Sequence, residues 1–306
     1  MQKKNAAART TGFSQPMSIE VVTGLRALAP RYEGFVIDLW GVIHDGAAPL
    51  PGAAECLRSL IDASKRIVLL SNAPRRADDA ARRIARIGVP AGLYHHLMTS
   101  GEEAWQHLYR REDPFHAALG RRCLHICSER DLEIRDGLGL EYVDTAEEAE
   151  FILNTGPAAW EDRLEDYEPL MRAALERDLP MVCANPDLIV MHGGRPALCA
   201  GALAKWYEDA GGRVRWHGKP FRGVYDACLG LLAINDRSRI LAIGDSLRTD
   251  IAGAAGAGLD SLLIAGGLHA EEFGIEAGRP PDPQRIEAAL RDGPYLPVGV
   301  AGSLCW

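Results

Sequence analysis

Residues 34–40 have the sequence Gly-Phe-Val-Ile-Asp-Leu-Trp, a short apolar run that carries a carboxylate, Asp38, near its end. Three further apolar runs follow, at residues 66–70, 239–243 and 261–264. Continuous apolar strands of this kind suit a parallel sheet that is covered by helices on both faces. The run at residues 34–40 therefore predicts a strand of such a sheet.

Helical stretches alternate with these strands. We predict helices at residues 53–63, 76–87 and 249–257, and the last two are followed by Gly88 and Gly258. Glycine just past a helix end is a common terminator. Strand–helix–strand alternation predicts an α/β fold with an open, doubly wound parallel sheet.

The middle of the chain repeats this alternation. Residues 122–128, 151–155 and 180–184 are predicted strands, and residues 164–177 and 201–210 are predicted helices. This pattern indicates a second α/β unit, inserted between the two halves of the larger sheet.

The expected domain organisation is therefore discontinuous. A core domain is predicted at residues 18–100 and 214–306, with an inserted α/β cap domain at residues 101–213. Residues 1–17 contain three basic residues and no acidic residue. A flexible tail is the favoured interpretation of this segment, and a transit peptide is the alternative.

Composition excludes several functional classes. The 306-residue chain has a formal net charge of −8 and is 47% hydrophobic and 25% charged, which indicates a globular protein. An acidic chain without a long basic run is not expected to bind nucleic acid. No apolar run approaches the ~18 residues of a membrane helix, so no membrane association is expected.

The seven cysteines occur at irregular spacing, and none forms a Cys-x-x-Cys pair. An odd number with this spacing favours buried, reduced thiols over a disulfide framework or a cysteine zinc site. We therefore expect a cytoplasmic protein.

Polar side chains stand at the ends of the predicted strands. Asp38, Ser71 and Asp245 each follow an apolar run, and Lys219 lies in a polar loop. Ligands of doubly wound sheets bind at the carboxyl ends of the strands. Phosphoryl transfer needs a nucleophile, a bridging cation and donors for the phosphate oxygens. One Asp can attack phosphorus and the other can hold Mg²⁺, while serine and lysine bind phosphate oxygens.

At these positions the chain resembles the haloacid dehalogenase superfamily. Residues 35–42, 69–72, 218–220 and 243–250 are similar to its four motifs and occur in the same order. The large insert, with Cys-Ala-Asn-Pro-Asp at residues 183–187, resembles the α/β cap of class IIA, the NagD-like branch.

The resemblance implies a role for each matching residue. Asp38 would form an aspartyl-phosphate, Lys219 would bridge phosphate and nucleophile, and Ser71 and Asn72 would bind phosphate. Mg²⁺ would be held by Asp38, Asp245 and the backbone carbonyl of Trp40. The remaining candidates are a supporting residue behind the metal and two cap residues that face the site: Asp250, Asn185 and Asp187.

Trp40 departs from the family pattern. Phosphatases of this family usually carry a second Asp two residues after the nucleophile, where it serves as general acid and base. Trp40 keeps the backbone carbonyl, but its indole side chain cannot exchange a proton in this way. Losing a general acid–base typically lowers the rate ~10²–10⁴-fold. His44 and Asp45 are candidates to replace it, although a turn role is favoured for both.

The expected function is Mg²⁺-dependent hydrolysis of a small phosphorylated metabolite through Asp38. The alternative is a catalytically weakened protein that binds phosphorylated metabolites or has a regulatory role. A nucleotide-binding Rossmann domain is disfavoured because no Gly-x-Gly-x-x-Gly follows the first strand. The oligomeric state stays open, with a homodimer through the cap as the expected form.

Overall fold

The computed structural model describes residues 19–268, 270, 273, 282–291 and 293–306. The predicted tail at residues 1–17 lies outside the described residues. Among the helices of the described part, none is long and apolar enough to cross a membrane.

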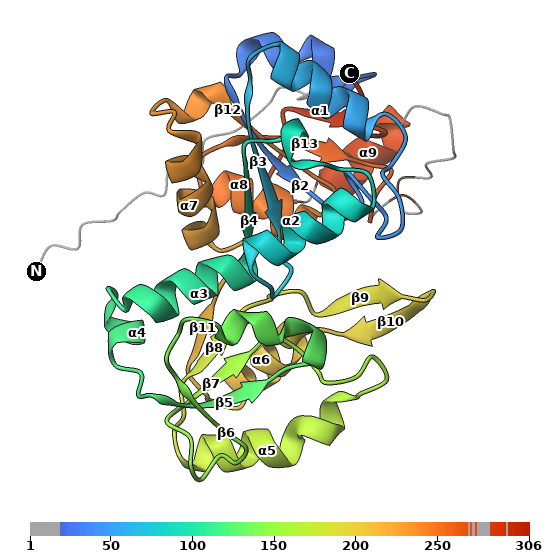
Figure 1. Cartoon of the computed structure of the whole chain (residues 1–306). Coiled ribbons are helices and arrows are strands. Elements are labelled where there is room, and N and C mark those ends of the chain that lie inside the picture. Colours follow the sequence, from blue (N-terminus) through green and yellow to red (C-terminus); the bar gives the residue numbers. More distant parts are fainter. Residues whose placement is uncertain (1–18, 269, 271–272, 274–281, 292) are drawn as a thin grey trace, which may run out of the picture.

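The larger sheet has seven parallel strands in the order β1-β14-β13-β12-β2-β3-β4 (Figure 1). We call it the core sheet. The four strands predicted from apolar runs are all present as neighbours in it. The strands, in chain order, are β1 (Glu20–Val22), β2 (Gly34–Asp38), β3 (Arg66–Ser71), β4 (His96–Thr99), β12 (Ile240–Gly244), β13 (Asp260–Ile264) and β14 (Gly299–Ala301).

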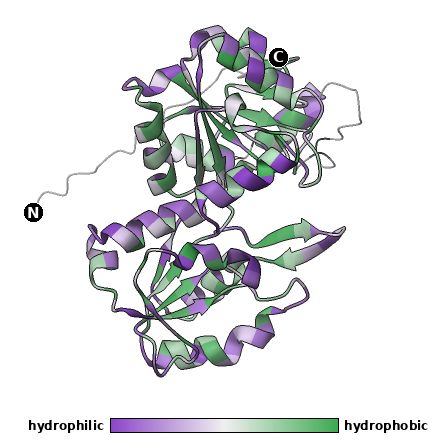
Figure 2. Cartoon of the chain, in the orientation of Figure 1, coloured by the Kyte–Doolittle hydropathy of each residue, from purple (hydrophilic) through white to green (hydrophobic). Residues whose placement is uncertain are grey.

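Helices cover both faces of the core sheet, as the apolar strands predict. Phe35 and Ile37 of β2 pack on one face with α1 (Ala53–Asp62) and α2 (Ala77–Arg86). Val36, between them, packs on the other face with α7 (Arg222–Leu232) and α8 (Ala252–Gly256). Successive side chains of a strand point to opposite faces of the sheet. Because helices cover both faces, every residue of β2 is buried. Figure 2 shows hydrophobic strands inside and hydrophilic helix surfaces outside. The fold class is confirmed.

A second sheet of five parallel strands, the cap sheet, has the order β11-β8-β7-β5-β6. The α5 and α6 helices pack on one face, and α3 and α4 precede it in the chain. The elements are α3 (Ser100–Arg110), α4 (Pro114–Ala117), β5 (Arg122–Ile126), β6 (Glu141–Val143), β7 (Phe151–Asn154), α5 (Leu164–Glu176), β8 (Met181–Cys183), α6 (Ala200–Asp209) and β11 (Val214–Trp216).

The strand β11 lies outside the unit predicted for it. Residues 214–306 were assigned to the core, whereas Val214–Trp216 pairs with β8 in the cap sheet. Three-residue strands carry too little apolar pattern to reveal which sheet they join. We propose that the cap begins with α3 and ends after Trp216, three residues later than the sequence predicted.

Other short elements were not predicted from the sequence. They include the antiparallel hairpin of β9 (Ile189–His192) and β10 (Arg195–Leu198), which projects beside the cap sheet (Figure 1). The predicted helix at residues 249–257 is divided into a π-helical turn at Leu247–Ile251 and α8. Such π turns widen the helix and are frequent at functional sites. The last helix is α9 (Pro283–Leu290).

Candidate active site

The predicted strand-end residues meet at the carboxyl edge of the core sheet. Asp38 is the last residue of β2, and Asp245 directly follows β12. The strands β2 and β12 are neighbours in the sheet. Lys219 enters from the loop after β11, and Asp250 from the π turn. All four side chains are buried. Parallel strands end at the same edge, and this is why residues that lie far apart in sequence converge here.

Lys219 forms the centre of this group. Its Nζ forms an ion pair with Asp38 Oδ1 and lies 2.8 Å from Asp250 Oδ1. The other oxygen of Asp250 accepts a hydrogen bond from the Ser246 amide at 3.2 Å. Burial alone would lower the pKa of Lys219, but the two carboxylates outweigh it and raise that pKa well above its ordinary value. The lysine therefore keeps its positive charge between two acids.

Three carboxylates crowd the same space. Asp38, Asp245 and Asp250 each offer an oxygen within 4.8 Å of the others. Burial, followed by the charge of Asp250, raises the pKa of Asp245 to about 6. Burial also raises the pKa of Asp38 well above its usual range, and Lys219 only partly opposes this. One lysine does not balance three acids, so the donor set fits a hard divalent cation that prefers oxygen ligands.

Glycines allow the backbone to approach Asp245 closely. Gly41 has a φ of +78°, and a Cβ there would lie 2.1 Å from Asp245 Oδ2. A Cβ on Gly267 would lie 2.2 Å from the same oxygen. That oxygen also accepts a hydrogen bond from the Leu268 amide at 2.7 Å. Any larger residue at Gly41 would therefore displace the carboxylate.

Asn72 connects the two units. Its Oδ1 accepts hydrogen bonds from the Lys219 amide at 2.8 Å and from Ser100 Oγ at 3.1 Å. Its Nδ2 donates to Asp187 Oδ1, from the cap, at 2.9 Å. Asn72 thus orients the lysine loop, and the phosphate contact implied by the family resemblance stays a prediction. Its neighbour Ser71 accepts a hydrogen bond from the Ala73 amide at 3.2 Å, which leaves the Ser71 hydroxyl hydrogen available to a ligand.

The two predicted cap residues have different positions. Asn185 Oδ1 accepts a hydrogen bond from the Asp187 amide at 3.0 Å, the geometry of an Asx turn. Asp187 reaches the core through Asn72. Burial raises the pKa of Asp187 above its ordinary value. Asn185 therefore shapes the turn, and Asp187 brings a carboxyl group to the edge of the site.

The comparisons with known proteins agree with this geometry. Residues 35–141 match the family model described as haloacid dehalogenase-like hydrolase, and residues 216–288 match a second model, described as HAD-hydrolase-like. The crystal structure of a haloacid dehalogenase-like hydrolase from Brucella suis is 35% identical, with a TM-score of 0.77, over 92% of this chain and 99% of that one. The chain belongs to the haloacid dehalogenase-like hydrolase family.

Curated relatives locate the chain within the family. Ribonucleotide monophosphatase NagD of Escherichia coli is 28% identical over 76% of this chain and 87% of NagD. Glycerol-3-phosphate phosphatase of Gallus gallus is 27% identical over 79% of this chain and 82% of that protein. The NagD-like class IIA assignment made from the motifs is confirmed, and the chain is a hydrolase of the haloacid dehalogenase-like family.

Trp40 occupies the position where haloacid dehalogenase-like phosphatases usually carry the second Asp. Its side chain is 47% exposed and stands edge-on to His44, with ring centroids 5.7 Å apart. His44 Nδ1 accepts a hydrogen bond from the Gly46 amide at 2.9 Å, and Asp45 Oδ1 accepts from the amides of Ala47 and Ala48. The turn role predicted for His44 and Asp45 is therefore present.

Sequence reasoning missed one group of residues beside this site. Glu103 and His107 lie on α3, and His217 lies two residues before Lys219. The available signal was the i, i+4 spacing of Glu103 and His107, which places both on one helix face. Nothing in the sequence shows that His217, more than 100 residues away, joins them.

Proposed function

We propose that the chain is a phosphohydrolase that acts on a small phosphate monoester through Asp38 and depends on Mg²⁺. The observation that carries this proposal is the buried chain of Asp38, Lys219 and Asp250 beside Asp245. Relatives named as ribonucleotide and glycerol-3-phosphate phosphatases support a small phosphorylated metabolite as substrate.

The first step is attack of an Asp38 carboxylate oxygen on phosphorus. A phosphorus–oxygen bond forms to Asp38, the bond to the ester oxygen breaks, and the alcohol leaves after taking up a proton. Lys219 stabilises the phosphoryl oxygens, and its charge favours the ionised form of Asp38. The free hydroxyl hydrogen of Ser71 donates to another phosphoryl oxygen.

Asp38, Asp245 and the backbone carbonyl of Trp40 would hold Mg²⁺. When bound, the ion offsets the negative charge of substrate and nucleophile. The support in this structure is the chemistry of the donors, which are oxygen atoms in a buried, acid-rich cluster. Asp250 fits a supporting role because its two oxygens already bind Lys219 and the Ser246 amide.

The second step returns the enzyme to its starting state. A water oxygen attacks phosphorus, the bond to Asp38 breaks, and inorganic phosphate leaves. This step needs a base, and the first needs an acid, but Trp40 supplies neither. Asp187 is the cap carboxyl group that best fits the role of the missing acid, because it contacts Asn72 and its burial favours the protonated form. The cap contact also supports water exclusion during the reaction.

A second function is supported by Trp40 alone. A haloacid dehalogenase-like protein without the usual acid–base would bind phosphometabolites and turn them over slowly, which suits a regulatory protein. Location in the cytoplasm and a homodimer through the cap stay predictions.

Phosphate release from a panel of phosphate esters, measured with Mg²⁺ and with EDTA, tests the proposal. We expect release with Mg²⁺ that EDTA abolishes, and background release by Asp38→Asn. Asp209→Asn, an exposed acid on α6, is the matched control and should retain full activity. Full activity in Asp38→Asn would exclude the covalent mechanism. Tight binding of an ester with background release in the parent would favour the regulatory function.

A further inference from the structure

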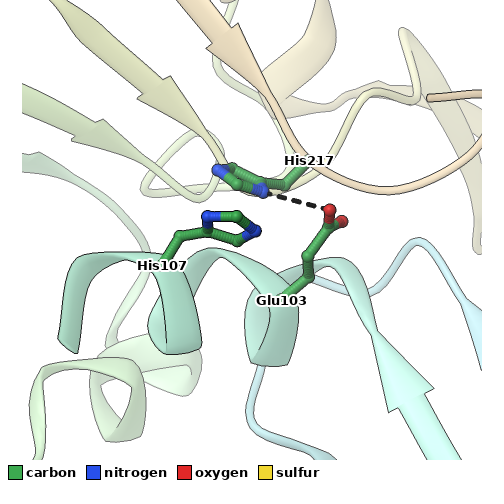
Figure 3. Close-up of side chains that lie close together, drawn as sticks. All are labelled: Glu103, His107 and His217. Atoms are coloured by element: carbon green, nitrogen blue, oxygen red, sulfur yellow. Dashed lines mark ion pairs between the residues drawn. The ribbon is translucent and has the colours of Figure 1, made fainter. Parts of the chain in front are cut away.

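A cluster of imidazole and carboxylate groups lies where both chain connections run between the core and the cap. Glu103 and His107 project from α3, directly after the first connection, and His217 lies on the second. Each offers a ligand atom within 4.8 Å of the others. Figure 3 shows the two imidazoles facing each other beside the Glu103 carboxylate.

The orientation of His107 is set by Asp113. His107 Nδ1 lies 3.1 Å from Asp113 Oδ2. The other oxygen of Asp113 accepts hydrogen bonds from the amides of Phe115 and His116 and so caps α4. With Nδ1 donating to a fixed carboxylate, Nε2 of His107 is left as the ligand nitrogen. A carboxylate behind an imidazole is the usual arrangement around metal-binding histidines.

A chain of hydrogen bonds sets the tautomer of His217. His116 Nδ1 lies 2.6 Å from Asp113 Oδ2 and donates to it, so His116 Nε2 is an acceptor. His217 Nε2 lies 3.2 Å from that acceptor and is therefore the protonated nitrogen. This leaves Nδ1 of His217 with a lone pair. His116 and Asp113 thus orient the cluster from behind.

The bare nitrogen of His217 faces an acid. His217 is only 2% exposed, its Nδ1 has no hydrogen-bond partner, and it lies 3.4 Å from Glu103 Oε1. The Gly218 amide donates to Glu103 Oε2 at 2.8 Å, which holds the carboxylate in place. Two buried acceptors that face each other repel unless a cation lies between them. The separation of 3.4 Å is long for a hydrogen bond between them.

We propose that Glu103, His107 and His217 form a binding site for a divalent transition-metal ion of the zinc class. Zinc bonds of 2.0–2.1 Å at tetrahedral angles place two ligand atoms about 3.3 Å apart. The separation of Glu103 Oε1 from His217 Nδ1 matches that spacing. Two imidazoles and one carboxylate select zinc-class ions over Mg²⁺. His107 is 42% exposed, so the fourth coordination position opens toward solvent.

The site differs from the carboxylate cluster at Asp38 in both chemistry and position. Its ion would join α3 to the segment at residues 217–219 and so join the two connections between core and cap. Lys219 follows His217 by two residues, and a bound ion would hold the loop that positions this lysine. The proposal does not depend on the function proposed above.

Zinc titration by calorimetry tests the proposal. The full-length chain is first treated with a chelator, and it carries Asp245→Asn so that the carboxylate cluster does not compete. We expect one zinc ion per chain and at least tenfold weaker binding after His107→Gln. The glutamine amide can still donate a hydrogen bond to Asp113, and position 107 is partly exposed, so the fold should tolerate the change. His192→Gln, an exposed histidine of β9, is the control and should bind zinc unchanged.

Two further measurements exclude a protein-only explanation. Asp113→Asn retains a capping side chain for α4 but removes the carboxylate behind His107, so zinc affinity should fall about 10–100-fold. Cobalt in place of zinc should give the visible absorption of tetrahedral coordination, and His107→Gln should remove it. Absence of saturable zinc binding, or equal zinc affinity in His107→Gln and His192→Gln, would show that hydrogen bonds alone hold the cluster together. Either result would overturn the proposal.

Discussion

Asn72 of the core donates a hydrogen bond to Asp187 of the cap, with 2.9 Å between Nδ2 and Oδ1. The same asparagine accepts the amide hydrogen of Lys219. One side chain therefore connects the cap carboxyl group to the loop that carries the central lysine. Because the contact joins the two units at the carboxyl edge of the core sheet, we expect cap position and catalysis to be coupled.

The Asp187 carboxyl group gives the first prediction. Burial raises its pKa and favours the protonated form, which suits a proton donor, so Asp187→Asn should lower the turnover number of alkyl phosphates at least tenfold. An activated aryl phosphate needs little protonation of its leaving group and should be affected less. Steady-state rates on both ester types check this, with Asp209→Asn as control. Equal losses on both would indicate that Asp187 only positions the cap.

Lys219 should also be central to stability. Lys219→Met leaves two buried carboxylates without their partner, which typically costs about 3–5 kcal/mol. Lys205→Met removes an exposed lysine that pairs with Asp209, and it should lower the free energy of unfolding by at most about 1 kcal/mol. Urea unfolding of the metal-free proteins gives both values. A similar cost for the two variants would contradict the buried network.

The carboxylate cluster predicts a pH dependence of stability. Burial and Asp250 raise the pKa of Asp245 from 3.8 to about 6, so the folded protein binds a proton more tightly than the unfolded chain. The contribution of Asp245 to the free energy of unfolding of the metal-free protein should therefore fall as pH rises from about 4 to 6, by on the order of 3 kcal/mol.

Asp245→Asn should flatten this pH dependence, and Mg²⁺ should oppose the loss in the parent by binding the ionised form. Urea unfolding at several pH values, with and without Mg²⁺, makes the comparison. A difference in stability between the metal-free parent and Asp245→Asn that stays constant between pH 4 and 6 would show that the pKa of Asp245 is not raised.

Trp40→Asp should restore the missing acid–base. General acid–base catalysis contributes about 10²–10⁴-fold, so turnover of alkyl phosphates should rise at least tenfold. The indole is 47% exposed, and the fold should therefore tolerate its loss. Trp40→Asn removes the indole without adding a carboxylate and should not raise the rate. Rapid alkyl-phosphate hydrolysis by the parent itself would show that another group already transfers the proton.

Local patterns in the sequence were sufficient for most of the core sheet. Each of β2, β3, β12 and β13 is a buried apolar run that can be recognised without its neighbours, and polar residues at the ends of β2, β3 and β12 indicated the site. The short strands β1, β4, β11 and β14 have three or four residues. Pairing, more than their own sequence, stabilises such strands, and so they were missed or assigned to the wrong unit.

The sequence by itself determined the α/β fold and the convergence of Asp38 and Asp245, because apolar runs mark parallel strands and the carboxyl ends of such strands meet at one edge of the sheet. The order of the four motifs indicated the family and added Lys219 to the site. Only the tertiary structure decided which atoms meet across the two units. The contact of Asn72 with Asp187 and the approach of His217 to Glu103 join residues more than 100 positions apart. Their geometry depends on how the cap packs against the core, and no local pattern records that packing.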